Sequence, residues 1–329
     1  MAKNTLFSKP MIGVDLGGTK IYTVVADETG AVLGSSKKST QGKKGFDAVM
    51  RRCAETVNEA LEQAGLSAGK CGGLGMGVPS PVDQNTGAAL FSPNLKWHNV
   101  PVKKTMEKHL STPVFVDNDV NLGMLGEFAL GAARGTNTIA GFLVGTGIGG
   151  GMIVNGNLIH GKNFTGGELG HMVVLAEGPP CGCGTRGCLE AVASRVALSR
   201  DINEAIRRGV PTMLKDMIEE GTDRIKSGML KKAYRAGDRL AVDLLNRCAW
   251  YVGIAVANIT NAIGPDMIIL GGGLYEALGQ ELLPVTQQSA QQHFFGPAGK
   301  DMPIRLAELG DNAVALGAAV FADRKLSAL

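Results

Sequence analysis

The stretch MIGVDLGGTKIYTVVA, residues 11–26, places two apolar runs on either side of a turn formed by Gly17, Gly18 and Thr19. Glycine adopts the backbone angles of tight turns, and the β-branched residues around it favour strands. Residues 27–30, DETG, predict a second tight turn before a third strand. The sequence therefore predicts a three-stranded meander near the N-terminus.

The same pattern returns at residues 138–160. The segment TIAGFLVG is followed by the glycine turn GTGIGGG at 145–151, an apolar run and an Asn155-Gly156 hairpin signal. Such repetition predicts an internally duplicated α/β protein, whose two similar lobes are expected to face each other across a cleft. The expected small lobe is 1–121 plus 312–329, and the expected large lobe is 122–311, with a metal-binding loop at 166–190.

Composition narrows the class of protein. At 329 residues the chain is longer than a typical single domain of about 100 to 200 residues, which agrees with two lobes. The net charge is only +3 and the basic residues are scattered, so we expect no nucleic-acid partner. The N-terminus has no apolar leader segment, and the longest apolar run, 249–259, is short for a membrane span. We therefore expect a cytoplasmic protein.

The first glycine turn carries residues suited to phosphate. Without Cβ atoms, Gly17 and Gly18 let backbone N–H groups approach an anion, while Thr19 and Lys20 offer a hydroxyl and a cation. Asp15 is the carboxylate placed to hold Mg²⁺, through water. The alternative is a plain hairpin with an exposed lysine, which does not need this polar set.

The second glycine turn formally matches the G-x-G-x-x-G fingerprint of dinucleotide-binding proteins. In those proteins the turn opens a helix, whereas here the run MIVNGNLIHG at 152–161 continues as alternating strand. The context therefore favours a second phosphate-binding hairpin over a NAD site. The expected phosphate contacts in it are Gly145, Thr146 and Gly147.

Two further glycines, Gly271 and Gly272, follow the apolar strand MIIL and precede a helical segment. They form either a tight corner or a flat backbone surface on which a purine can lie. The second interpretation adds them to the nucleotide-binding residues.

Asp119 follows the predicted strand PVFV at the point where a helix begins. An aspartate there can accept the proton of an attacking hydroxyl during phosphoryl transfer. It can equally be the N-cap of the helix, and Asp117 and Asn118 compete for that role. From spacing alone, the catalytic and capping interpretations both remain open.

A cluster of soft ligands follows in the pattern H-x9-C-x-C-x4-C. His171, Cys181, Cys183 and Cys188 supply four ligands for a closed tetrahedral site, which predicts zinc. Because no position is left open for water, a structural ion is favoured over a catalytic one. A redox thiol pair and chance clustering are the alternatives.

Three polar residues are candidate readers of a polyhydroxylated substrate. A metal clamp would hold Glu168 and Glu190 rigidly on either side of the ligand set, and Asn94 lies in the segment FSPNLKWHN. Each also has a plain structural interpretation: a solvated loop glutamate, a first-turn helix carboxylate and a turn former after proline.

Together these motifs resemble the ROK family of sugar kinases and repressors, and within it the bacterial-type glucokinases. The resemblance spans nearly the whole chain, and its most specific part is the cysteine segment with its upstream histidine. The segments that carry it are DLGGTK at 15–20, FSPNLKW at 91–97, DNDVN at 117–121, GTGIGGG at 145–151, GGELGH at 166–171, CGCGTRGCLE at 181–190 and LGGG at 270–273.

The resemblance implies an actin-like (ribonuclease H-like) fold of two α/β lobes, a homodimer or homotetramer, and a hexose and MgATP as substrates. It implies that Asp119 is the general base, and that His171 contacts the sugar through the ring nitrogen that does not bind zinc. The sugar-binding residues implied by the resemblance are Asn94, Asn118, Asp119, Glu168, His171 and Glu190.

The implied reaction is transfer of phosphate from ATP to the 6-hydroxyl of glucose. Mannose, fructose or an N-acetylhexosamine are alternative acceptors, and other nucleotides or polyphosphate are alternative donors. A non-catalytic sugar-sensing regulatory protein is the alternative of another class. Family repressors carry a DNA-binding module before the first turn, whereas fourteen residues precede Asp15 here.

Overall fold

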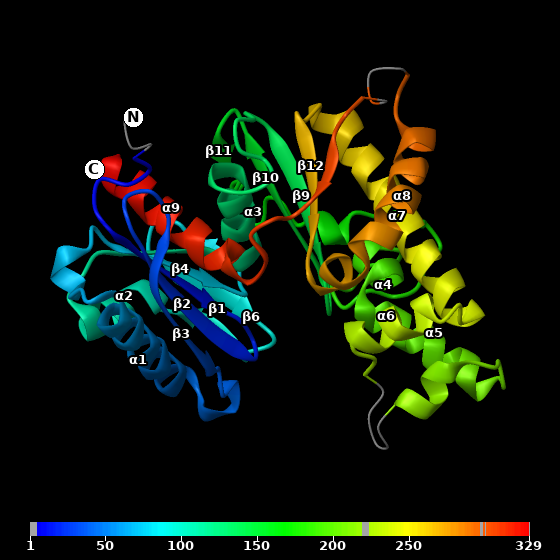
Figure 1. The fold of residues 1–329 in the computed structure, drawn as a ribbon, viewed down its shortest axis with the longest axis horizontal. Coiled ribbons are helices and arrows are strands. Elements are labelled where there is room, and N and C mark those ends of the chain that lie inside the picture. The colour runs from blue at the N-terminus through cyan, green and yellow to red at the C-terminus, as the bar shows by residue number, and fades with distance from the viewer. Residues whose placement is uncertain (1–4, 219–223, 297–298, 300, 329) are drawn as a thin grey trace. The chain divides into compact units, whose positions relative to one another are not determined.

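The computed structural model describes residues 5–218, 224–296, 299 and 301–328. They form two compact units: one comprises Met1–Gly135, Asn157–Gly167 and Glu308–Leu329, and the other Thr136–Gly156 and Glu168–Ala307 (Figure 1). The lobe boundaries expected from the sequence, 121/122 and 311/312, stay a prediction. Some residues of the expected lobes lie outside the described residues, namely 1–4, 219–223, 297–298, 300 and 329.

The first unit is built on a five-stranded sheet in the order β3-β2-β1-β4-β8. The predicted meander forms its antiparallel part, and β1, β4 and β8 run parallel to one another. The strands are β1 (Met11–Leu16), β2 (Lys20–Ala26), β3 (Val32–Ser39), β4 (Leu74–Val78) and β8 (Val114–Asn118).

Helices cover both faces of this sheet, with α1 on one face and α9 on the other (Figure 1). Gly13 and Gly75 allow α9 to approach closely, because a Cβ on either would lie 1.8 Å from a carbonyl oxygen of that helix. The C-terminal helix therefore packs on the first unit. The helices are α1 (Phe46–Ala64), α2 (Val102–Leu110), α3 (Asp119–Ala129) and α9 (Ala313–Ser327).

A buried carboxylate anchors the chain where it re-enters the first unit. Glu127 on α3 is fully buried, and its two oxygens accept hydrogen bonds from the backbone N–H groups of Ala132, Glu308 and Leu309. Hydrogen bonds of this kind compensate for the loss of hydration of a buried charge. Glu127 thereby joins α3 to the segment that leads into α9.

The first unit also holds a small antiparallel sheet that the sequence did not predict. Its strands, β5 (Val82–Asp83), β6 (Ala88–Ser92) and β7 (Trp97–Val100), are too short for a clear alternating pattern. The FSPNLKW segment makes the turn between β6 and β7, and Asn94 is exposed in that turn.

The second unit repeats the plan of the first. Strands β9 and β10 are antiparallel, while β9, β12 and β13 are parallel, giving the order β10-β9-β12-β13. This matches the order β2-β1-β4-β8 and confirms the predicted duplication. The strands are β9 (Ile139–Val144), β10 (Ile148–Val154), β12 (Met267–Gly271) and β13 (Ile304–Leu306), and β11 (Asn157–Leu158) follows the Asn155-Gly156 turn.

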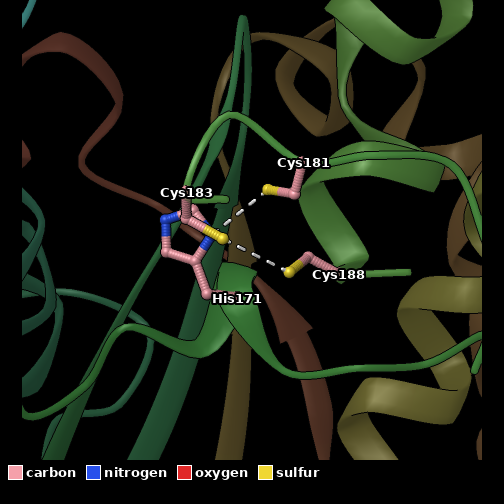
Figure 2. A group of neighbouring side chains, drawn as sticks. All are labelled: His171, Cys181, Cys183 and Cys188. Atoms are coloured by element: carbon pink, nitrogen blue, oxygen red, sulfur yellow. Dashed lines mark hydrogen bonds between the residues drawn. The ribbon is translucent and has the colours of Figure 1, made fainter. Parts of the chain in front are cut away.

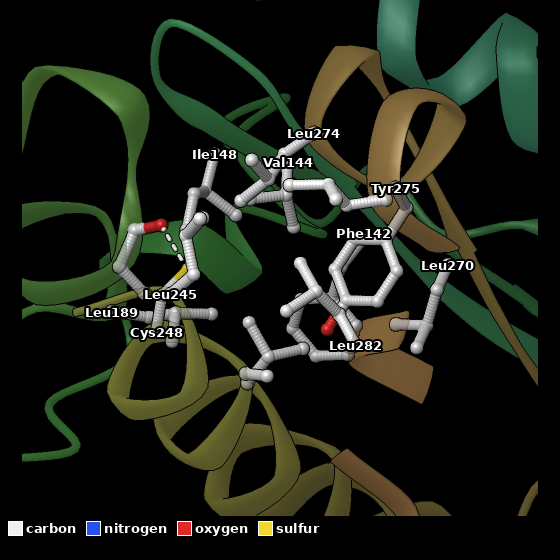
Figure 3. Packing of buried hydrophobic residues seen from close by; sticks show 14 of the residues in the cluster. Phe142, Val144, Ile148, Leu189, Leu245, Cys248, Leu270, Leu274, Tyr275 and Leu282 are labelled. Carbon is white, nitrogen blue, oxygen red and sulfur yellow. Dashed lines mark hydrogen bonds between the residues drawn. The ribbon is translucent and has the colours of Figure 1, made fainter. Parts of the chain in front are cut away.

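The core of the second unit lies between this sheet and its helices, and it contains Phe142, Leu245 and Tyr275 (Figure 3). Helix α7 is long and apolar enough to span a membrane, but half of its apolar stretch is buried and it packs on α8. A core helix has this composition. The helices are α4 (Leu189–Ala193), α5 (Arg195–Arg207), α6 (Ser227–Arg235), α7 (Arg239–Ile263) and α8 (Gly273–His293).

Candidate active site

Three parallel strands of the first unit end side by side. In the register of the sheet Asp15 is paired with Gly77, and Gly77 with Asp117. The first glycine turn follows β1, and Asn118 and Asp119 follow Asp117 directly. The carboxyl edge of a parallel sheet is a common ligand-binding position in α/β proteins. The predicted phosphate turn and the predicted base therefore leave the sheet at one edge.

Hydrogen bonds to the backbone close the first glycine turn, which lies next to Asn94, a predicted sugar-binding residue. The Gly17 N–H donates to the carbonyl of Lys20 at 2.9 Å, and the Thr40 hydroxyl donates to the carbonyl of Gly17 at 2.7 Å. A Cβ on Gly18 would lie 3.5 Å from the Cβ of Asn94. The structure thus brings Asn94 next to the turn, a proximity that sequence spacing alone does not reveal.

Asp15 lies in a network of charges. Its side chain is buried, and this burial raises its pKa to about 6, with Lys20 and Lys37 opposing the shift and Asp311 adding to it. The Lys20 ammonium is 2.6 Å from Asp311, and the Lys37 ammonium is 3.1 Å from the same carboxylate. The cation that we expected to bind phosphate is therefore held in an ion pair.

The structure shows which of Asp117, Asn118 and Asp119 is the N-cap of α3. The Asn118 side chain is the cap, because its oxygen accepts hydrogen bonds from the N–H groups of Val120 at 2.9 Å and Asn121 at 3.1 Å. Asp119 is the first helical residue and is half-buried, and its carboxylate also accepts from Val120 N–H. Asp119 is thus not needed as the cap.

Asp117 forms hydrogen bonds that stabilise the junction between β8 and α3. Its buried carboxylate accepts hydrogen bonds from the Asn118 N–H at 2.7 Å, the Asn121 side-chain amide at 3.3 Å and the His160 ring Nε2 at 2.5 Å. Sequence reasoning did not identify His160, because a single histidine far along the chain carries no pattern. The network fixes the backbone from which Asp119 projects.

The second glycine turn is closed in a similar way. The Gly145 N–H donates to the carbonyl of Gly147 at 2.9 Å, and the first residues of α5 donate to the carbonyls of Gly145 and Thr146. The corner at Gly272 has a φ of +81°, and a Cβ there would lie 2.7 Å from the backbone of Val144. The two predicted nucleotide-binding elements therefore adjoin at the end of β9.

Glu190 is bound to this second turn. Its carboxylate accepts a hydrogen bond from Ile148 N–H at 2.9 Å, and a Cβ on Gly147 would lie 2.3 Å from the same carboxylate. Glu168 has a raised pKa, chiefly through desolvation by nearby protein atoms although much of its side chain is exposed. The charge of His171 opposes this rise in the pKa of Glu168, and the charge of Glu190 adds to it.

The predicted metal ligands converge (Figure 2). The ligand atoms of His171, Cys181, Cys183 and Cys188 all lie within 4.8 Å of one another. The Cys183 and Cys188 sulfurs are 3.7 Å apart, and Cys181 Sγ is 3.6 Å from His171 Nδ1. Tetrahedral zinc with Zn–S bonds of about 2.3 Å requires S–S separations of about 3.8 Å. The cluster therefore fits a zinc ion.

Thr185, which the sequence did not single out, supports the cluster. Its hydroxyl lies 3.2 Å from Cys183 Sγ and 3.0 Å from Cys188 Sγ. Hydrogen bonds from Thr185 lower the pKa of Cys183 to about 6, whereas burial raises the pKa of Cys181 to about 12. Because zinc binds thiolates, a cation at this site would favour deprotonation of Cys181.

Residues 11–325 match the sequence pattern that defines the ROK family. The chain belongs to the ROK family. It is 36% identical over 312 residues to the glucokinase of Thermotoga maritima, covering 94% of this chain and 96% of that protein. It is 29% identical to the xylose repressor of Caldicellulosiruptor bescii, covering 93% of this chain and 76% of the repressor. Both classes of ROK protein are thus among its relatives.

The ROK fold is also evident from solved structures. The glucokinase of Streptomyces griseus in complex with glucose and AMPPNP superposes with a TM-score of 0.82 at 31% identity, covering 96% of this chain and 99% of that one. This likeness confirms the predicted actin-like α/β fold. Membership of the ROK family and likeness to kinase structures together support a sugar kinase.

Proposed function

We propose that this ROK protein is an ATP-dependent hexose kinase that converts glucose to glucose 6-phosphate. One observation carries the proposal: Asp15, Gly77 and Asp117 are neighbours across three parallel strands, so the first phosphate turn and Asp119 leave one sheet edge. A kinase requires the base and the phosphate-binding backbone to be held close together. Two glucokinase relatives at 33% and 36% identity support glucose as the acceptor.

In the proposed reaction Asp119 accepts the proton of the sugar 6-hydroxyl. The hydroxyl oxygen forms a bond to the γ-phosphorus as the bond from that phosphorus to the β-γ bridging oxygen breaks, and ADP leaves. Thr19 and the backbone of the two glycine turns bind the phosphates. Asp15 would be the residue that holds the Mg²⁺ of MgATP, an ion that would neutralise phosphate charge.

The residues proposed to bind the sugar are Asn94, Asn118, Asp119, Glu168, His171 and Glu190. We propose that zinc, bound by His171 and the three cysteines, is structural. His171 directs Nδ1 toward Cys181, so Nε2 is the nitrogen that remains for a sugar hydroxyl.

The test is ADP release in the presence of MgATP and a panel of glucose, mannose, fructose and N-acetylhexosamines. Glucose is expected to give the highest kcat/KM. Replacement of Asp119 by Asn should lower kcat by about 10²- to 10⁴-fold, because a general base contributes that much, while glucose still binds. Unchanged turnover would reject Asp119 as the base.

A sugar-sensing regulatory role is the second candidate, because the xylose repressor of Caldicellulosiruptor bescii is a relative. The same panel separates the two roles. Hexose binding without formation of a hexose phosphate from any sugar, with ATP, other nucleotides or polyphosphate as donor, would favour the sensor. Release of ADP that depends on both hexose and Asp119 would favour the kinase.

The proposal also covers the location and the oligomeric state of the enzyme. ATP and hexoses meet in the cytoplasm during carbohydrate metabolism and glycolysis, and we expect the protein to act there. We also expect a homodimer or homotetramer, which light scattering on the purified protein will test.

A further inference from the structure

Arg195, the first residue of α5, directs its side chain at the second glycine turn. One terminal nitrogen of the guanidinium donates to the Thr146 hydroxyl, and the other donates to the Ser227 hydroxyl at 3.2 Å. Ser227 is the first residue of α6, and its hydroxyl lies 3.6 Å from the position of a Cβ on Gly273. Arg195 thus connects the phosphate turn with the glycine corner at 271–273.

The charge of Arg195 has no acidic partner among the residues that the structure describes. Its side chain is half-buried, and this burial, with a smaller effect of Arg224, lowers the pKa of the guanidinium. Binding of an anion compensates for the loss of hydration of a partly buried guanidinium. Of its five N–H donors, two are used by Thr146 and Ser227, so three remain for a ligand.

The backbone at the start of α5 is held without the Arg195 side chain. The Arg195 N–H donates to the carbonyl of Gly145 at 3.0 Å, and the Val196 N–H donates to the carbonyl of Thr146 at 3.2 Å. The Ser194 hydroxyl caps the helix by accepting from Ala197 N–H. These hydrogen bonds do not involve the side chain of residue 195. Neither the turn nor the helix therefore requires an arginine at this position.

We propose that Arg195 is a nucleotide-binding residue whose guanidinium contacts the phosphates of ATP or ADP at the second glycine turn, with Ser227 orienting it. The ligand class is a nucleoside di- or triphosphate, because a planar cation with several donors fits phosphate oxygens. This inference rests on the proposed kinase function. It adds a charged contact to a turn that otherwise offers backbone N–H groups and one hydroxyl.

The inference is tested by calorimetric binding of ADP and adenosine to the full chain. Replacing Arg195 by Gln should weaken ADP binding about 10- to 100-fold, the range expected for a lost charge-assisted hydrogen bond, and leave adenosine binding unchanged. Replacing Arg195 by Lys should restore part of the ADP affinity. In turnover, the KM for ATP should rise while the KM for glucose stays constant.

Arg207→Gln is the matched control, since Arg207 lies on the same helix but pairs with Glu204 and is largely exposed. It should bind ADP like the wild type. Equal weakening of ADP and adenosine by Arg195→Gln would assign a structural role to Arg195 and overturn the inference, as would unchanged ADP binding. Failure of the wild-type chain to bind ADP at all would overturn the proposed kinase function and the inference together.

Discussion

The two glycine turns occupy equivalent places in two similar sheets, yet their surroundings differ. The first turn contains its own charged residues, Asp15 and Lys20, and these face Lys37 and Asp311. The second turn has no charged residue between Gly145 and Gly151. Its charged neighbours come from helices that follow much later in the chain.

This difference shows how a duplicated framework can diverge. The backbone closure is alike, since Gly17 and Gly145 each donate an N–H across their own turn. In the first turn Asp15 lies near two lysines, Lys20 and Lys37, that are themselves paired with Asp311. In the second, Glu190 fills the space beside Gly147 and lies two residues from Cys188 of the metal cluster. The second turn should therefore depend on zinc, and the first should depend on pH.

The largest expected effect tests that dependence on zinc. Wild-type protein should hold about one zinc per chain, and replacing buried Cys188 by Ser should remove it. Turnover should fall at least about 100-fold, because Glu190 and His171 lose their support. Elemental analysis and the thermal midpoint measure the effect. Cys71→Ser, outside the cluster, is the control; a zinc-free chain with full activity would refute the site.

The second effect concerns Asp15 and pH. Its pKa rises from 3.8 to about 6 on folding, so the folded state binds a proton more tightly than the unfolded state. The contribution to stability is complete below pH 3.8 and is lost as pH rises through 6. A shift of about two units corresponds to about 3 kcal/mol. Asp15→Asn should remove this dependence in urea titrations from pH 4 to 8; an unchanged pH profile would contradict it.

The third prediction compares a glycine in each turn. Alanine at Gly147 would put a methyl group 2.3 Å from the Glu190 carboxylate, whereas alanine at Gly18 meets only Asn94 at 3.5 Å, an ordinary contact. Gly147→Ala should displace the Glu190 carboxylate and break its hydrogen bond to Ile148 N–H, at a cost of about 1–3 kcal/mol of folding free energy, and Gly18→Ala should cost much less. Equal losses of folding free energy in urea unfolding of the two variants would contradict this difference between the turns.

Much of this comparison could be predicted from the sequence, because the relevant signals are local. Two glycine turns between apolar runs indicated the duplicated meanders, and the spacing of one histidine and three cysteines indicated the metal cluster. In both cases the residues that act together are close in the chain. Local patterns of this kind survive without knowledge of the tertiary fold.

The contacts that distinguish the turns could not be predicted, since they join single residues across long stretches of sequence. Lys20 pairs with Asp311, Glu190 binds Ile148 N–H, and Arg195 reaches Thr146. A lone charged residue has many possible partners, and only packing selects among them. The N-cap role of Asn118 was open for another reason, because three adjacent residues could each cap the helix.

The smallest expected effect concerns the ion pairs of the first turn. Asp311 is largely exposed, so Asp311→Asn should change the folding free energy by less than about 1 kcal/mol. It should nevertheless free Lys20 and Lys37 for phosphate, and the KM for ATP should fall. Glu55→Gln, which removes an exposed partner of Lys38 in the same unit, is the control and should leave that KM unchanged. A higher KM for ATP in Asp311→Asn would instead mean that Asp311 helps to bind the nucleotide, and that the charges of the first turn act as one unit with it.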